Sequence, residues 1–124
     1  NHVHCIMRAK EGNLPDLIHD FKRFTASKII KTINQVAESR RDWMIKRFEF
    51  AAKYNSRNSQ HQFWTHENHA ELIIHQPFFL QKLNYIHQNP VRAGWVARPE
   101  DWLYSSMRNY TGLPALIEID VSDF

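Results

Sequence analysis

Helical spacing of apolar side chains is the feature that most limits how this chain can fold. In residues 14–34 such side chains recur at i, i+4 and i+7, as they do on one face of a helix. They are Leu17, Phe21 and Phe24. Residues 38–54 carry a second apolar face, and lysine and arginine cover much of the remaining surface. The members of this face are Met44, Phe48, Ala51 and Ala52.

Prolines delimit a third predicted helix. Pro77 suits the first turn of a helix, where its missing N–H is not needed. Pro90 disfavours helical geometry at the residue before it, so this helix should not run far past Asn89. Further on, residues 99–106 (PEDWLYSS) are expected to form a short helical turn.

Two segments alternate their side chains as strands do. In residues 2–8 the two histidines fall on one face and apolar side chains fall on the other. Residues 115–121 (ALIEIDV) alternate in the same way. Strands near both ends, with helices between them, predict an α+β fold. The length of 124 residues predicts one domain, spanning residues 1–124.

Composition excludes several classes of protein. Hydrophobic residues make up 43% of the chain and charged residues 23%, which is ordinary for a globular domain and argues against disorder. The single cysteine, Cys5, excludes a disulfide framework and a zinc site built on paired cysteines. No apolar run approaches the ~18 residues of a membrane span, and no signal-peptide pattern is present. We therefore expect a reducing cytoplasm and no membrane partner.

Positive charge is concentrated in the first half of the chain. Residues 1–60 hold 12 lysines and arginines against 6 acidic residues, whereas residues 61–124 hold 4 against 7. The two net charges are +6 and −3. Such asymmetry indicates an anionic partner for the first half, most often nucleic acid, although solvated helix faces also carry these residues.

The histidine pair in NHVHCIM, at the start of the chain, is a candidate set of metal ligands. His2 and His4 would project from the same face of a strand, as two ligands of one ion must. Eight histidines in 124 residues give roughly 0.5 pairs of this spacing by chance. The pair alone therefore does not distinguish a metal site from coincidence.

Tyr85 stands off the apolar face of the third predicted helix. Instead, its helical neighbours are Lys82 at i−3 and Asn89 at i+4. A structural tyrosine lies more often within the apolar stripe or at its rim. An exposed tyrosine on a helix is nevertheless common. The pattern therefore leaves open whether Tyr85 is catalytic or is an ordinary surface residue. The predicted core face consists of Phe79, Leu80, Leu83, Ile86 and His87.

Five motifs make the chain resemble a known family. They are NHVHCI, FKRFTA, QFWTHEN, KLNYIHQNPVRAGWV and PEDWLYSSMRNY. They occur in the order seen in the REP-associated tyrosine transposases, a branch of the single-tyrosine HUH (histidine, hydrophobic residue, histidine) transposases. The resemblance covers about residues 1–110, and YIHQNPVRAGWV (85–96) is its most specific part.

The resemblance implies a role for each matching residue. His2 and His4 would bind a divalent cation, Mg²⁺ or Mn²⁺, and Asn89 would complete the metal site. Tyr85 would attack single-stranded DNA at hairpin-containing ends, leaving a 5′-phosphotyrosine and a free 3′-OH. His87 is a less favoured ligand because it lies on the predicted core face. The implied fold is ferredoxin-like, with an antiparallel sheet packed against helices.

Basic and aromatic side chains supply the candidate DNA contacts. Lys82, beside Tyr85, would contact a phosphate or stabilise the phenolate, unless it is simply a solvated lysine. Phe63 and Trp64 would stack unpaired bases or, as aromatic residues do more often, pack in the core. Six cations in the first half would bind phosphates with a strength that falls with salt. They are Lys22, Arg23, Lys28, Arg40, Arg41 and Arg47.

One departure from the family leaves rival functions open. Family members begin with a strand–helix–strand segment, and nothing precedes Asn1 here, so we expect an N-terminally incomplete domain. One rival is a catalytically inactive module, domesticated or truncated, that binds hairpins of single-stranded DNA. Another is a metal-dependent hydrolase that uses water as its nucleophile. The motifs do not distinguish a monomer from a homodimer. The expected location is the cytoplasm, in association with the nucleoid.

Overall fold

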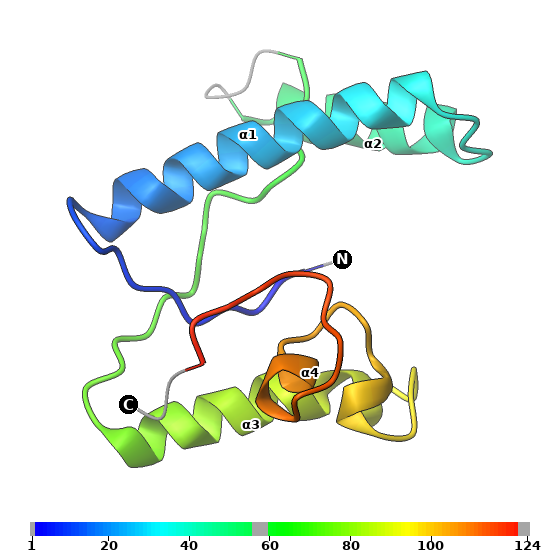
Figure 1. The fold of residues 1–124 in the computed structure, drawn as a ribbon. Coiled ribbons are helices and arrows are strands. Elements are labelled where there is room, and N and C mark those ends of the chain that lie inside the picture. Colours follow the sequence, from blue (N-terminus) through cyan, green and yellow to red (C-terminus); the bar gives the residue numbers. More distant parts are fainter. Residues whose placement is uncertain (1, 56–59, 122–124) are drawn as a thin grey trace. The chain divides into compact units, whose positions relative to one another are not determined.

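The computed structural model describes residues 2–55 and 60–121, and this part of the chain is helical (Figure 1). The three predicted helices are present, and the short turn expected over residues 99–106 contains a 3-10 helix. The elements are α1 (Leu14–Gln35), α2 (Arg41–Lys53), α3 (Gln76–Arg92), the 3-10 helix η1 (Pro99–Asp101) and α4 (Met107–Tyr110).

The predicted α+β fold is wrong for the residues that the structure describes. Neither residues 2–8 nor residues 115–121 form a strand, and no sheet occurs within 2–55 and 60–121. Alternation gives a segment two faces, but a strand also needs a neighbouring backbone with which to exchange hydrogen bonds. Neither segment has such a partner in the described chain, so the ferredoxin-like antiparallel sheet is absent there.

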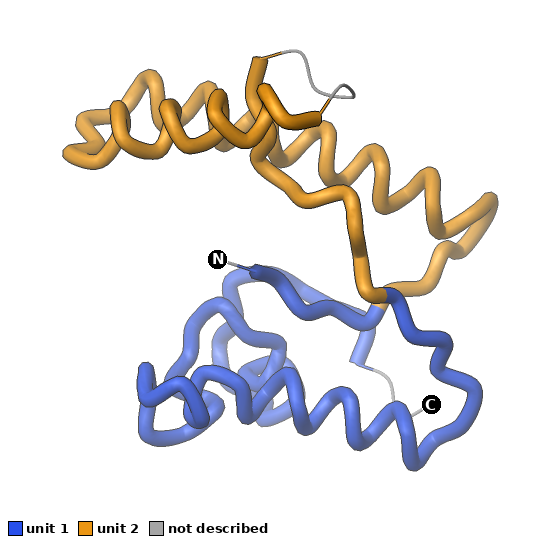
Figure 2. Tube along the Cα trace, turned by 180° about the vertical axis from the view of Figure 1, so that it is seen from behind, with its two compact units in different colours: residues 1–6, 70–124 blue, residues 7–69 orange. Residues whose placement is uncertain are grey.

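The chain divides into two compact units (Figure 2). One unit comprises residues 1–6 together with 70–124, and the other comprises residues 7–69. The N-terminal histidines and α3 therefore belong to the same unit, although most of the sequence lies between them.

In the unit of residues 7–69, α1 and α2 pack against each other. The segment that follows α2 covers this helix pair with aromatic rings. The ring centre of Phe63 lies 5.3 Å from that of Phe48 in α2, and Trp64 lies 6.0 Å from Phe21 in α1. Trp64 Nε1 also donates a hydrogen bond of 2.9 Å to Thr25 Oγ1. These contacts make the aromatic segment part of the packing of this unit.

Helix α3 continues through Pro90 and ends at Arg92, not far past Asn89, as predicted. A proline inside a helix removes one donor and crowds an earlier carbonyl. Here the proline lies in the last turn, where it disrupts few backbone hydrogen bonds of the helix. The following amides still find acceptors, since Ala93 N donates to Asn89 O and Trp95 N donates to Pro90 O, both at 3.0 Å. The helix therefore includes the proline and ends two residues after it.

Helix α3 packs against η1, and η1 in turn contacts α4. This packing buries one face of α3. Phe79 and His87 are each 5% exposed, as the helical wheel predicted. His87 Nε2 is hydrogen-bonded to Ser106 Oγ at 2.9 Å. Leu80 was expected on the same face but is 51% exposed. The buried arc of α3 is therefore narrower than predicted.

Candidate active site

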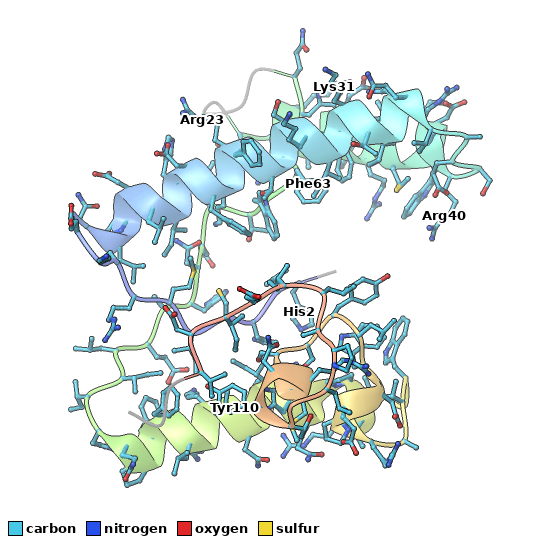
Figure 3. The ribbon with its side chains drawn as sticks, viewed as in Figure 1. His2, Arg23, Lys31, Arg40, Phe63 and Tyr110 are labelled. Atoms are coloured by element: carbon cyan, nitrogen blue, oxygen red, sulfur yellow. The ribbon has the colours of Figure 1, made fainter. Side chains whose placement is uncertain are left out.

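A histidine ring and the candidate nucleophile meet within one unit. The ring of His4 contacts that of Tyr85 edge to face, with the ring centres 5.4 Å apart. The rings of His2 and His4 also meet edge to face, at 4.7 Å. Figure 3 shows His2 on the N-terminal segment of this unit. The fold thus gathers three of the four residues that the resemblance assigns to the reaction centre.

Tyr85 is displayed on α3 rather than buried in it. Its side chain is 42% exposed, whereas Phe79 and His87 of the same helix are buried. The predicted position off the apolar face is therefore confirmed. An exposed phenol is accessible to a polymeric substrate.

His4 is neutral at neutral pH. Burial lowers the pKa of His4 below the ordinary value of 6.5, and the neighbouring His2 lowers it further. The imidazole therefore carries a free lone pair at pH 7, which a metal ion or a proton requires.

The two histidines would supply only part of a set of metal ligands. Two imidazoles suit Mn²⁺ better than Mg²⁺, which prefers oxygen. Within 2–55 and 60–121, no three His, Cys, Asp or Glu side chains gather into a metal-binding group. Asn89 lies in the last turn of α3, one helical turn beyond Tyr85. His2 and His4 therefore fit a divalent cation whose remaining ligands are an amide or phosphate oxygens.

His87, the alternative ligand, is part of the core. It is buried, hydrogen-bonded to Ser106 Oγ, and its ring lies 5.4 Å from that of Tyr110, which Figure 3 labels in α4. Burial lowers the pKa of His87. Packing accounts for this histidine without a metal.

Arg92 is a further residue beside Tyr85, and no sequence motif indicated it. Its guanidinium carbon Cζ lies 5.7 Å from the centre of the Tyr85 ring, a cation–π distance. The available signal was spacing, because helical residues seven positions apart lie two turns apart on one face. That signal was weak because Pro90 predicted a helix end close to this position.

Lys82 is engaged away from the tyrosine. Its ammonium forms an ion pair with Glu71 and lies 5.1 Å from the ring centre of Phe78, in the first turn of α3. Its predicted role beside the Tyr85 phenolate would require this ion pair to open.

Most of the cations predicted to contact DNA are accessible on α1, on α2 and between them. Three form ion pairs: Arg23 with Asp20, Arg40 with Glu38, and Arg41 with Asp42. Lys28 and Arg47 lie over aromatic rings of their own helices. Exposed pairs of this kind contribute little to stability, and the cations that form them stay on the surface. Figure 3 shows Arg23 pointing away from the side of α1 that faces Phe63.

Three further candidates have structural contacts. Lys22 is half-buried, and its Nζ donates to the Thr65 carbonyl at 2.7 Å. Phe63 and Trp64 are half-buried and lie against each other with ring centres 5.1 Å apart. These contacts correspond to the packing alternative rather than to base stacking.

The two units carry opposite net charge. Residues 7–69 contain 12 lysines and arginines against 7 acidic residues, a net charge of +5. Residues 1–6 and 70–124 contain 4 against 6, a net charge of −2. The basic surface and the candidate nucleophile thus belong to different units.

Comparisons with known proteins identify no relative of this chain. No protein-family model, curated protein or solved structure matches it. In the described part of the chain, no helix is both long enough and apolar enough to cross a membrane. A family assignment therefore rests on the motifs and on the geometry around Tyr85.

Proposed function

We propose that this chain is a single-tyrosine DNA transposase of the REP-associated type, which cleaves and rejoins single-stranded DNA at hairpin-containing ends. The observation that carries the proposal is the edge-to-face contact between His4 and Tyr85, at 5.4 Å. The motif resemblance assigns both residues to one reaction centre, and they come from distant parts of the sequence. In the part of the chain that the structure describes, the contact exists without a sheet, so the proposal does not depend on the fold class that was expected.

Tyr85 supplies the nucleophile in the proposed reaction. Its Oη attacks the phosphorus of a phosphodiester, and a P–O bond to the tyrosine forms as the P–O3′ bond breaks. The phenolic proton passes to water, and the departing O3′ takes up a proton to become a 3′-OH. The 5′-phosphotyrosine conserves the energy of the broken bond, so another 3′-OH reverses the step and joins strands without ATP.

The histidines support this chemistry. An un-ionised phenol is a weak nucleophile, so Tyr85 needs activation or a polarised phosphate. When bound to His2 and His4, with Asn89, Mg²⁺ or Mn²⁺ supplies Lewis-acid polarisation of the scissile phosphate. The lowered pKa of His4 keeps its imidazole neutral and therefore competent as a ligand.

A covalent-adduct assay tests the proposal. The protein is incubated with a pool of labelled DNA hairpins with randomised single-stranded flanks and Mn²⁺ or Mg²⁺, then analysed on a denaturing gel. We expect a protein–DNA adduct that Tyr85→Phe abolishes. Tyr104→Phe is the matched control, because Tyr104 is exposed in the same unit and contacts only Trp102 among the described rings. An adduct that persists in Tyr85→Phe rejects Tyr85 as the nucleophile.

The charge division between the units favours a second candidate, a catalytically inactive module that binds single-stranded DNA hairpins. Residues 7–69 carry the net charge of +5 and do not include Tyr85. Binding of this kind needs no nucleophile. Hairpin binding without any adduct or cleavage supports this candidate, whereas cleavage that survives Tyr85→Phe indicates a hydrolase.

A further inference from the structure

The unit that contains Tyr85 has few cations, so the partner of each one can be stated. It has four, Lys82, Arg92, Arg98 and Arg108, against six acidic residues. A DNA strand that reaches Tyr85 therefore enters a unit of net negative charge. Local cations must offset the repulsion of its phosphate.

Three of the four cations are engaged by protein groups. Carboxylates hold two of them, and backbone carbonyls hold the third. Lys82 pairs with Glu71, Arg98 pairs with Asp101 and Glu100, and Arg108 donates to the carbonyls of Pro114 and Glu100.

Arg92 is the exception. Within residues 2–55 and 60–121 its guanidinium has neither a carboxylate nor a carbonyl partner, and it lies over the ring of Tyr85 with Cζ 5.7 Å from the ring centre. The side chain is exposed, as is Tyr85. Its N–H donors are therefore available to a ligand at the position where the proposed reaction takes place.

We infer that Arg92 binds the DNA phosphate that Tyr85 attacks. The inference rests on the proposed function and adds to it a phosphate-binding residue that lies outside the histidine pair. A guanidinium presents planar, paired donors that match two phosphate oxygens, which an ammonium does not. Its charge opposes the net negative charge of the unit and remains beside the phosphate after the phosphotyrosine has formed.

A purely structural role makes different predictions. A cation in the last turn of a helix interacts favourably with the helix dipole, and Arg92 occupies that turn of α3. Arg92→Lys keeps this charge but loses the paired donors, whereas Arg92→Gln loses both. The two variants therefore separate phosphate recognition from stabilisation of the helix end.

The first measurement is DNA binding in a Tyr85→Phe background, where no adduct forms. The probe is a fluorescein-labelled DNA hairpin with single-stranded flanks, and its fluorescence anisotropy is followed over a range of salt concentrations. Arg92→Gln should weaken binding roughly 10-fold and reduce the slope of log K against log salt by about 0.7. Arg98→Gln removes the same charge from a paired arginine and should leave the slope unchanged. A slope that Arg92→Gln leaves unchanged overturns the inference.

The second measurement is the rate of adduct formation with Tyr85 intact. Arg92→Gln should slow it roughly 10- to 100-fold, and Arg92→Lys should keep the salt slope but still slow the adduct. An undiminished rate in Arg92→Gln overturns the inference and leaves the proposed function standing. Absence of an adduct in the wild type rejects the proposed function, and the salt slope then decides whether Arg92 binds phosphate. If circular dichroism shows that Arg92→Gln is unfolded, the rate of Arg92→Lys decides.

Discussion

His87 is a buried histidine whose charged form the fold disfavours. It is 5% exposed and hydrogen-bonded to Ser106, and burial lowers its pKa below 6.5. Between the folded-state pKa and 6.5, the unfolded chain binds more protons than the folded chain. The free energy of unfolding therefore falls as the pH drops below about 6.5.

Replacing this histidine should flatten the pH dependence of stability. We expect the free energy of unfolding to fall from pH 7.5 to pH 5.5 in the wild type and to fall less in His87→Gln, because a glutamine side chain does not titrate. Urea titrations in metal-free buffer at both pH values measure the difference. His69→Gln is the control for removing a histidine outside the core, since His69 is exposed. Equal pH dependence in wild type and His87→Gln would contradict the expectation.

The sequence predicted most side-chain positions on α3, Leu80 being an exception, but it predicted fewer of the side-chain contacts. The wheel assigned His87 to the core and Tyr85 to the exposed side, because both depend only on the direction in which a helical residue points. The partner of Lys82 is Glu71, which precedes the helix, so helical spacing carried no information about it. The contact between His4 and Tyr85 depends on tertiary structure, and only the resemblance indicated it.

At the scale of elements, the end of α3 is fixed by Gly94. This residue has a φ of 73°, and a Cβ added to it would meet no atom within 4 Å. Its amide donates to the carbonyl of Val91 at 2.9 Å. Such a left-handed residue just after a helix satisfies the last carbonyls, and glycine adopts it without strain. The cost of a side chain here is therefore conformational rather than steric.

Gly94→Ala should destabilise the protein by about 1 kcal/mol, because alanine disfavours the left-handed conformation. Gly94→Asn should cost less, since asparagine tolerates this conformation better than alanine does. Chemical denaturation of the three proteins measures both differences. If alanine and asparagine were equally destabilising, or if alanine had no effect, the assigned role of Gly94 in ending α3 would be refuted.

The elements also show which sequence patterns are sufficient for a structure. A helix bonds to itself, so apolar spacing and a first-turn proline were enough to predict α1, α2 and the start of α3. A strand bonds to another strand, and alternation in residues 2–8 or 115–121 says nothing about whether a partner exists. The strand predictions therefore failed where the helix predictions succeeded.

At the scale of the whole molecule, charge and chemistry are distributed over different units. The net charge of +5 in residues 7–69 suits long-range attraction of DNA, which depends on total charge and is screened by salt. The unit of Tyr85 has a net charge of −2, and under the proposed function it would rely on local cations such as Arg92. Counting charges along the sequence predicted the excess of positive charge in the first half of the chain. Identifying the cations near Tyr85 that carry no carboxylate partner required the structure.

This division predicts that equal charge changes in the two units affect DNA binding unequally. Lys28→Gln with Arg47→Gln removes two cations of the basic unit that lie over aromatic rings rather than beside carboxylates. Fluorescence anisotropy with a labelled single-stranded DNA hairpin should show a salt slope reduced by about 1.4, about 0.7 for each lost phosphate contact. Lys82→Gln with Arg98→Gln changes the net charge equally but removes cations that are paired with carboxylates. That control should retain most of the salt slope. If both double variants lost the same amount of slope, total charge rather than its location would determine DNA binding.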